Sequence, residues 1–442
     1  MLKMSRRTGV IAFSLYLGTV LALMFRPGAY PPHFEGIDYV KIARGNYTQM
    51  ETFYAGRVLH PLVVRAVAAA AHVPIDWRAF LWVAMASLVV LFGLLGTYFA
   101  LETPAEAWLC VPLLATATVI EQYRDYYWHD LFYAMLCAAF FLTLRWNRWA
   151  SLPILFLLYV TRESTLVLAV VVVVAAALWR QWAFSGAALA VGVAGAKITG
   201  ALVARAQPSH HGISMLMLDA LKIPYNFALN ICGLEFWVNT DASTIGDAPK
   251  WIVDLPPWLH LGEIHQVGYC GFFWQRPAET AVLIASAFGI LPLLVIMAIL
   301  RKRGAPPLGK FHLRVAFAYG LLMFALTPLV GTVPARYVLY AWPLFWIFAT
   351  ALIHPVMRDT RTRVEFVGLC VLAAWVPAIV RVFSGPPNFE PDYFVDLSSA
   401  GLIASLAILA AIYVCGYVLL RTSFARSGES HRAVSHGATL AL

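Results

Sequence analysis

Ionisable side chains gather in four short segments of a chain that is otherwise strongly apolar. The four segments are Glu35–Gly45, Glu121–Asp130, Thr161–Ser164 and Pro334–Tyr337. Arginine's planar guanidinium binds two phosphate oxygens at once, and a nearby carboxylate can take a proton from an attacking hydroxyl. Ionisable groups at membrane depth are costly, so they usually have a partner or a task. These residue types therefore predict a site that handles a phosphate-bearing lipid.

The composition indicates that these segments belong to an integral membrane protein. Of the 442 residues, 61% are hydrophobic and only 12% are charged, whereas soluble domains carry roughly a quarter charged residues. The net charge of +9 comes from Lys and Arg at the edges of apolar runs, where they orient helices and meet anionic lipid. We therefore expect the lipid bilayer as a partner, and no nucleic acid.

Apolar runs near the length of a spanning helix, about 20 residues, recur about twelve times. They predict an all-α polytopic transmembrane helical bundle with spans near 9–25, 79–99, 106–122, 130–145, 149–161, 164–179, 183–205, 278–300, 315–333, 336–353, 364–383 and 400–421. We expect one domain over residues 1–421 and a disordered cytoplasmic tail over 422–442. The first run follows Lys3, Arg6 and Arg7 with no small-residue cleavage site after it, which indicates an uncleaved signal-anchor helix.

The links between the apolar runs alternate in character, and this alternation predicts an orientation. The short basic links, at 145–148, 179–182, 301–314 and 358–363, should face the cytoplasm together with both termini. The opposite side then holds the four ionisable segments and two large loops, 26–78 and 206–277, rich in aromatic residues and Pro. We expect interfacial helices in both loops, one of them from His60 to His72. Cys232 and Cys270 share the second loop and can pair if that side is oxidising.

Several short motifs resemble those of the GT-C glycosyltransferases, polytopic enzymes that take a sugar from a polyprenyl-phosphate carrier. The matching motifs are Gly36–Tyr39 with Arg44–Gly45 and Gly56–Pro61, similar to the first extracytoplasmic loop of that family; Thr161–Glu163, similar to its TRE tripeptide; and Arg336–Tyr337 with Pro343, similar to its late RY…P helix. The resemblance covers the helix plan and these motifs, which share one predicted side of the membrane.

The resemblance implies a role for each matching residue. Asp38 corresponds to the general base that acts on the acceptor, and either Asp125 or Asp130 corresponds to a second acid. The residues implied in donor binding are Tyr39, Lys41, Arg57, Arg124, Arg162, Glu163 and Arg336. The expected reaction is the inverting transfer of a sugar from a polyprenyl phosphate to a glycan, lipid or protein acceptor, because one carboxylate base suffices for inversion. The expected place is the extracytoplasmic face of a bacterial inner membrane.

The first loop departs from the pattern of the family in one respect. Many members carry two adjacent acids there, whereas Asp38 is followed by Tyr39. This difference argues against a metal role for the loop, so we assign no metal ligand. A divalent cation is the one cofactor left open.

Each ionisable segment also has a purely structural explanation. Asp38 can cap a helix that starts at Tyr39. Arg162 and Glu163 can pair with each other to close a helical hairpin. Likewise, His129 and Asp130 can cap a helix, and Arg336 can anchor one at the membrane interface.

Two other functions fit the same helix plan. An O-antigen ligase or polymerase-like enzyme would concentrate its arginines and a histidine in the large loop, and here the acids of the first loop weigh against it. A secondary transporter, or a permease for a lipid-linked substrate, usually shows repeated halves and broken, polar helices at the midplane. No repeat is visible in the sequence, and away from the ends of the predicted spans only Lys197 is strongly polar.

Overall fold

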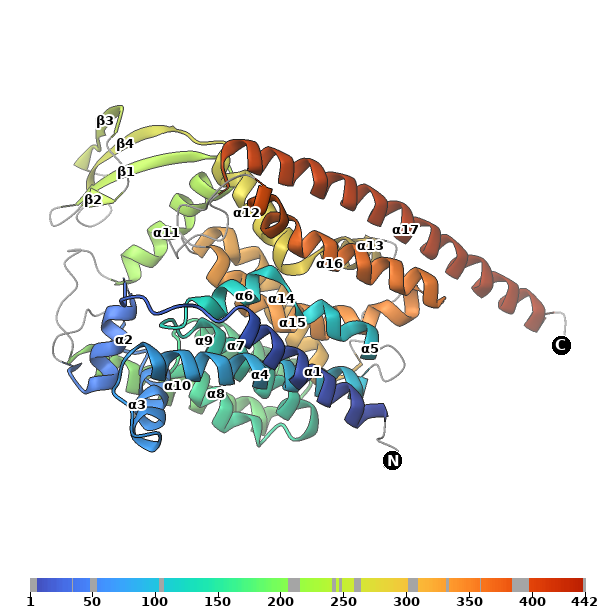
Figure 1. Ribbon diagram of the computed structural model, residues 1–442, viewed down its shortest axis with the longest axis horizontal. Helices are drawn as coiled ribbons and strands as arrows, with labels where there is room; N and C mark the ends of the chain where they lie inside the picture. Colours follow the sequence, from blue (N-terminus) through green and yellow to red (C-terminus); the bar gives the residue numbers. More distant parts are fainter. Residues whose placement is uncertain are drawn as a thin grey trace.

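The fold is a helical bundle with a small β-sheet at one end (Figure 1). The computed structural model describes residues 6–33, 35–47, 54–102, 107–205, 215–240, 244–245, 249–257, 264–300, 309–330, 334–357, 359–383 and 397–439. Helices occupy nearly all the predicted apolar runs within these ranges. The prediction of a mainly helical, multi-pass membrane protein is therefore confirmed.

Among the described residues, fewer helices than the twelve predicted spans are long and apolar enough to cross a membrane. Six are long and apolar enough: α1 (Arg6–Met24), α4 (Trp77–Glu102), α10 (Trp182–Val203), α14 (Phe311–Val330), α16 (Thr360–Phe383) and α17 (Ser399–Thr439). A seventh span arises if α12 (Gln275–Phe288) and α13 (Leu291–Leu300) are taken together, although they meet at 89°. The twelve predicted spans are thus not confirmed in the described part of the chain.

The other apolar runs form shorter helices for identifiable reasons. The run 106–122 breaks into α5 (Ala107–Cys110), a 3₁₀ turn (Val111–Leu114) and α6 (Ala117–Arg124). Pro112 lies in the 3₁₀ turn, and Thr116 caps α6 by accepting a hydrogen bond from the Val119 amide; both residues favour helix starts. The predicted short hairpin forms α8 (Ser151–Tyr159) and α9 (Thr165–Leu178), which are nine and 14 residues long.

The first large loop carries two short helices, α2 (Glu35–Arg44) and α3 (Leu59–Ala70). The predicted helix from His60 is present as α3. It ends two residues early, because His72 adopts a left-handed φ of 54° that no α-helix continues.

The second large loop differs from the prediction. It carries α11 (Met215–Asn230) and then an antiparallel sheet of order β2-β1-β4-β3, made of β1 (Leu234–Thr240), β2 (Thr244–Ile245), β3 (Trp251–Asp254) and β4 (Ile264–Phe272). The aromatic residues that indicated interfacial helices are also strong strand formers. Gly233 makes the turn into β1 at a φ of +69°, where a Cβ would meet the Phe273 carbonyl oxygen at 2.9 Å. No disulfide joins Cys232 and Cys270.

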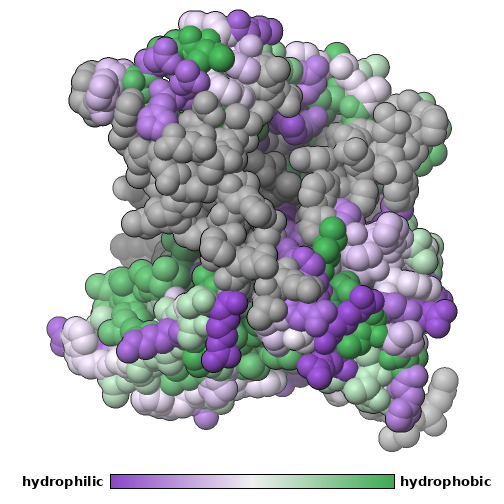
Figure 2. Space-filling model, turned by 90° about the vertical axis from the view of Figure 1, so that its left-hand side faces the viewer, coloured by the Kyte–Doolittle hydropathy of each residue, from purple (hydrophilic) through white to green (hydrophobic). Residues whose placement is uncertain are grey.

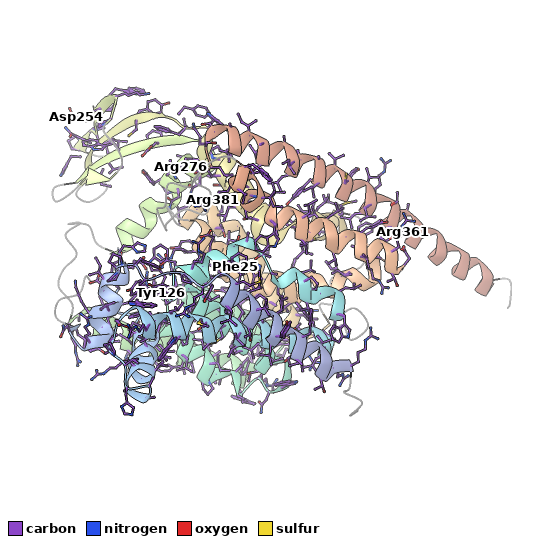
Figure 3. All side chains as sticks on the ribbon, viewed as in Figure 1. Phe25, Tyr126, Asp254, Arg276, Arg361 and Arg381 are labelled. Atoms are coloured by element: carbon purple, nitrogen blue, oxygen red, sulfur yellow. The ribbon has the colours of Figure 1, made fainter. Side chains whose placement is uncertain are left out.

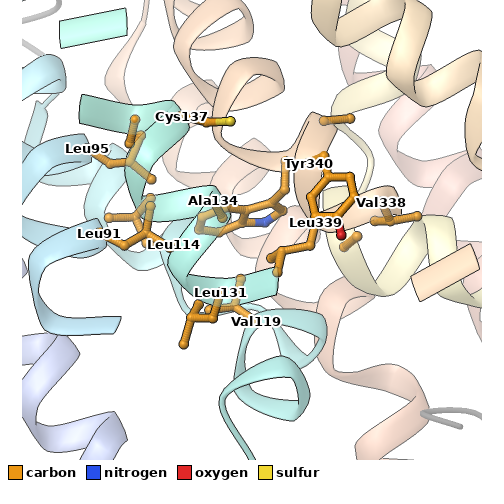
Figure 4. Close-up of a cluster of buried hydrophobic side chains, with 14 of the residues drawn as sticks. Leu91, Leu95, Leu114, Val119, Leu131, Ala134, Cys137, Val338, Leu339 and Tyr340 are labelled. Carbon is orange, nitrogen blue, oxygen red and sulfur yellow. The ribbon is translucent and has the colours of Figure 1, made fainter. Parts of the chain in front are cut away.

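The centre of the bundle is packed around α7 (Asp130–Trp146), which contacts both α4 and α15 (Pro334–Val356). Figure 4 shows this core, with Leu91 and Leu95 of α4, Ala134 of α7, and Leu339 and Tyr340 of α15. All five side chains are buried. This packing fixes the first turns of α7 and α15 beside each other, which matters for the site.

Both chain termini lie at one end of the molecule, while α2, α3 and the sheet lie at the other (Figure 1). Figure 2 looks onto this second end, where hydrophilic and hydrophobic side chains alternate. We name it the sheet end, and the end with the termini the terminal end. At the terminal end α17 continues as helix to Thr439, so most of the predicted disordered tail, 422–442, is helical.

Candidate functional site

A carboxylate of the first loop and an arginine from late in the chain form the centre of a buried cluster at the sheet end. Arg336, in the first turn of α15, donates from Nη1 to Glu35 Oε1 at 2.6 Å and from Nη2 to Glu35 Oε2 at 2.7 Å. Arg57, in the link before α3, donates from Nη1 to the same Oε2 at 3.1 Å. Such two-point arginine–carboxylate pairs are strong and directional. Glu35 is therefore held from two sides.

Asp130 is the second carboxylate of the cluster and the first residue of α7. Its side chain is 1% exposed. Its Oδ1 accepts from Arg162 Nη1 at 2.9 Å and from the hydroxyl of Tyr340, while its Oδ2 accepts from Arg336 Nε at 2.8 Å. Arg336 therefore bridges Asp130 and Glu35.

Glu163 is the third carboxylate, and it binds Arg57 at the edge of the cluster. Arg57 donates from Nε to Glu163 Oε2 at 2.9 Å and from Nη2 to Oε1. Arg57 is nearly buried, whereas the side chain of Glu163 is 60% exposed. The pair therefore joins a buried cation to a carboxylate that water can reach.

His129 and Tyr39 connect the arginines to Glu35 through a hydrogen-bond chain with one direction. Arg162 Nη1 lies 2.9 Å from His129 Nε2 and can only donate, so Nε2 is the acceptor and Nδ1 carries the proton. His129 Nδ1 then donates to the Tyr39 hydroxyl at 2.8 Å, and that hydroxyl donates to Glu35 Oε2 at 2.9 Å. The chain fixes the neutral tautomer of the imidazole.

Aromatic rings cover the two most buried guanidinium groups. Arg336 lies 4.2 Å from the centre of the Trp128 ring, and Arg162 lies 4.8 Å from Tyr340 and 5.2 Å from Tyr337. Ring faces attract cations most when water is excluded. These contacts stabilise the charge of each arginine in an apolar setting.

The cluster is electrically balanced, with three arginines and three carboxylates among its described members. Burial alone would raise the pKa of the Glu35 carboxyl, but Arg336 and Arg57 outweigh it and hold the pKa well below its ordinary value. Partial desolvation likewise opposes ionisation of Glu163, but Arg57 and Arg162 lower its pKa to about 2. Burial, reinforced by the arginines, lowers the pKa of His129 well below its ordinary value. At neutral pH Glu35 and Glu163 are therefore ionised and His129 is neutral.

The four predicted segments do converge. They contribute the start of α2, the start of α7, the link between α8 and α9, and the start of α15, all at the sheet end. Helix starts and links leave these charges at the rim of the apolar bundle, where opposite charges can gather. Buried charges are tolerated only when such partners compensate them.

Asp38, the predicted general base, is not among the carboxylates bound to arginine. It pairs with Lys41 at 2.9 Å on its own helix. Glu35, one turn earlier on α2, binds Arg57 and Arg336 instead. Thus Lys41 is also outside the cluster, and Tyr39 is within it.

Of the two candidates for a second acid, only one lies in the cluster. Asp130 is in the cluster, whereas Asp125 accepts a hydrogen bond from Tyr30 at 3.1 Å and has His33 at 3.9 Å. Arg124, a predicted donor-binding residue, is half-exposed and lies 3.9 Å from Glu121. The structure thus brings together Tyr39, Arg57, Asp130, Arg162, Glu163 and Arg336 of the predicted residues.

The structure tests the purely structural explanations given for Arg162, Glu163, His129 and Arg336. Arg162 and Glu163 are not ion-paired with each other, since each binds a partner from another segment. His129 makes no side-chain capping bond to α7, and Arg336 is a buried bridge rather than an interfacial anchor. Apart from Asp38, which lies inside α2 and pairs with Lys41 of the same helix, these residues therefore have long-range partners.

Sequence reasoning assigned no functional role to Glu35, His129 or Tyr340. Glu35 and His129 stood in the segments already selected, but nothing in the sequence distinguished them from their neighbours. Tyr340 follows Arg336 by four residues, the spacing of one helical face, and that spacing could have revealed it.

A hollow of about 390 Å³ at the sheet end is lined by residues outside the cluster. Its lining combines aromatic and apolar side chains with one charge of each sign: Tyr30, Pro31, Pro32, Val40, Arg44, Asp76, Trp77 and Tyr127, with Ala29 at the edge. No group of three His, Cys, Asp or Glu side chains within the described ranges is arranged to hold a metal ion. No family model, curated protein or solved structure matches this chain.

Proposed function

We propose that the protein is a membrane glycosyltransferase that moves a sugar from a polyprenyl phosphate to an acceptor at the extracytoplasmic face. The observation that carries the proposal is the cluster of three buried arginines, drawn from three segments, at one end of an apolar helical bundle. Guanidinium groups held in place by carboxylates and rings are suited to bind a phosphate, because they need no reorganisation when charge develops on it.

The proposed reaction is a single displacement. The acceptor oxygen forms a bond to the anomeric carbon while the bond from that carbon to the phosphate oxygen breaks. The electron pair of the broken bond stays on the phosphate, next to the arginines, and the acceptor proton goes to a carboxylate. The product has the opposite anomeric configuration.

Glu35 and Asp38 are the two carboxylates of the first loop that could accept this proton. Glu35 contacts the arginines and is linked to His129 through Tyr39. Asp38 has Lys41 as its partner. We favour Glu35, because only it touches the groups that would hold the donor, and so lies where an acceptor would approach.

One experiment tests the function and this choice together. A deletion strain is complemented with the wild type, Glu35→Gln or Asp38→Asn, and its envelope glycans are compared by mass spectrometry. We expect the deletion to remove one sugar, the wild type and Asp38→Asn to restore it, and Glu35→Gln to fail although the protein reaches the membrane. Unchanged glycans in the deletion strain would refute the proposed function.

A secondary transporter is the second candidate, and the bent pair α12–α13 favours it. The 89° bend follows Gly289, which has a φ of +55° and lies against the backbone of Cys370. Transporters bind substrates at such interrupted helices. Proteoliposomes that carry a lipid-linked sugar across the membrane without forming a glycoside would support this candidate over transfer.

A further inference from the structure

The balance of charge in the cluster sets a condition on any anionic ligand. Three carboxylates already neutralise the three arginines. A phosphate that joined this set unchanged would add an uncompensated negative charge to a buried site, which is strongly unfavourable. One of the three carboxylates must therefore leave its arginine when the ligand binds.

The three carboxylates differ in how easily they could leave. The exposed side-chain fractions are 1% for Asp130, 13% for Glu35 and 60% for Glu163. Asp130 and Glu35 each bind two arginines, whereas Glu163 binds Arg57 alone. Glu163 lies in the link between α8 and α9 and can turn into water, so its departure costs the least solvation.

The guanidinium of Arg57 would stay in place after Glu163 left. Its Nη1 donates to Glu35 Oε2 at 3.1 Å and lies 3.2 Å from the Tyr39 hydroxyl. Only the edge formed by Nε and Nη2 faces Glu163. That edge presents two parallel donors, the arrangement that binds two oxygens of a carboxylate or a phosphate equally well.

We propose that Glu163 is a displaceable internal ligand of Arg57, and that the phosphate group of a phosphate ester binds by exchanging with it on the Nε–Nη2 edge. The inference rests on the proposed function and makes it specific. Arg57 is the guanidinium that meets the incoming phosphate. Arg162 and Arg336 keep their buried carboxylate partners and stay in place when the phosphate binds.

The exchange is tested by direct binding to the purified full-length protein in a maltoside detergent at fixed salt. Decyl phosphate and inorganic phosphate are titrated separately by calorimetry. Because Glu163→Gln removes the competing charge and keeps the side-chain size, we expect it to bind decyl phosphate about tenfold more tightly than the wild type, or about 1.4 kcal/mol. Arg57→Gln should bind neither probe.

Two variants separate the exchange from general effects of charge or folding. Glu279→Gln removes an equal charge from an exposed pair with Arg276, which lies 3.6 Å away at the same end of the molecule (Figure 3), and we expect wild-type affinity. The double variant Arg57→Gln/Glu163→Gln removes the pair as a unit and keeps the cluster neutral. It should fold as the wild type does and bind no phosphate.

The outcomes distinguish the ligand source and the two levels of the proposal. A gain for both probes in Glu163→Gln supports exchange with any phosphate, and a gain for decyl phosphate alone supports exchange with a lipid headgroup. Unchanged or weaker binding in Glu163→Gln, or retained binding in the double variant, would overturn the exchange. Binding that follows this pattern in a protein without transfer activity would overturn the glycosyltransferase proposal and leave the exchange standing.

Discussion

The two ends of the molecule each carry a charged cluster, and the two clusters are built differently. At the sheet end, three carboxylates and three arginines neutralise one another under aromatic rings. At the terminal end, Glu102 of α4 is the one acid among the described residues that faces Arg145, Lys310 and His312. Lys310 is more than half exposed there, so water can solvate its charge, whereas protein groups provide the balance at the sheet end.

The comparison indicates which cluster loses more stability when one of its charged partners is removed. Where water can solvate an orphaned charge, the loss of a partner costs little. Where the neighbours are buried, the orphaned charge has no substitute. The terminal-end cluster is suited to fasten α4, α7 and α14 at a water-facing surface, whereas the sheet-end cluster is suited to hold charges in fixed positions for a ligand.

The largest effect should follow from Asp130→Asn. This change leaves Arg162 and Arg336 without one of their buried carboxylates, so we expect a loss of about 3–5 kcal/mol in stability. The loss is measured as a lower Tm in detergent and as a shorter half-life at a fixed temperature. A variant with the Tm of the wild type would contradict the contrast between the two ends.

Tyr340→Phe should have the next largest effect. The change removes one hydrogen bond to the buried Asp130 carboxylate but keeps the ring over Arg162. Hydrogen bonds to charged groups contribute about 1.5–3 kcal/mol. Thermal unfolding of Tyr340→Phe beside Tyr337→Phe, whose ring also lies over Arg162, isolates that bond, and equal Tm values would argue against it.

The pH dependence of stability should reflect buried histidines at the sheet end. Burial lowers the pKa of His60 to about 3 and, with the arginines, lowers that of His129. Below pH 6.5 the unfolded chain therefore binds more protons than the folded chain, and each histidine removes about 1.4 kcal/mol of stability per pH unit.

This loss should be visible as a falling Tm between pH 6.5 and 5, a window that lies above the ordinary pKa of the carboxylates. His60 is packed among the rings of Tyr39, Phe80 and Phe132, so a phenylalanine side chain fits at this position. Because His60→Phe removes one of the two histidines, it should make the fall in Tm about half as steep. An unchanged slope in this variant would show that His60 does not titrate on unfolding.

The smallest effect should come from Glu102→Gln at the terminal end. Its cationic partners Arg145 and Lys310 are both partly exposed and can be hydrated, so we expect a loss of about 1 kcal/mol or less. High salt should reduce the difference from the wild type further. A loss as large as that of Asp130→Asn would mean that the two clusters are energetically alike.

Much of the helix plan and the convergence of four segments could be predicted, because apolar runs and the positions of Arg and acid are direct properties of the sequence. The choice between Glu35 and Asp38 could not, since residues three apart share a helix face and only packing decides which reaches Arg336. The number of spans could not be fixed from apolar length alone, because breaks at Pro112 and Gly289 divide two of the predicted runs. The sheet was missed because its aromatic residues suit an interface as well as a strand.

Arg336 is the last residue of the cluster to leave the ribosome. Glu35 and Arg57 emerge first, then Asp130, Arg162 and Glu163, and at that stage three acids face two arginines. The excess negative charge lasts until Arg336 arrives, nearly two hundred residues later, to close the gap between Glu35 and Asp130. A nascent or truncated chain that ends before α15 would therefore expose an unmatched carboxylate, a mark by which membrane quality control could recognise it.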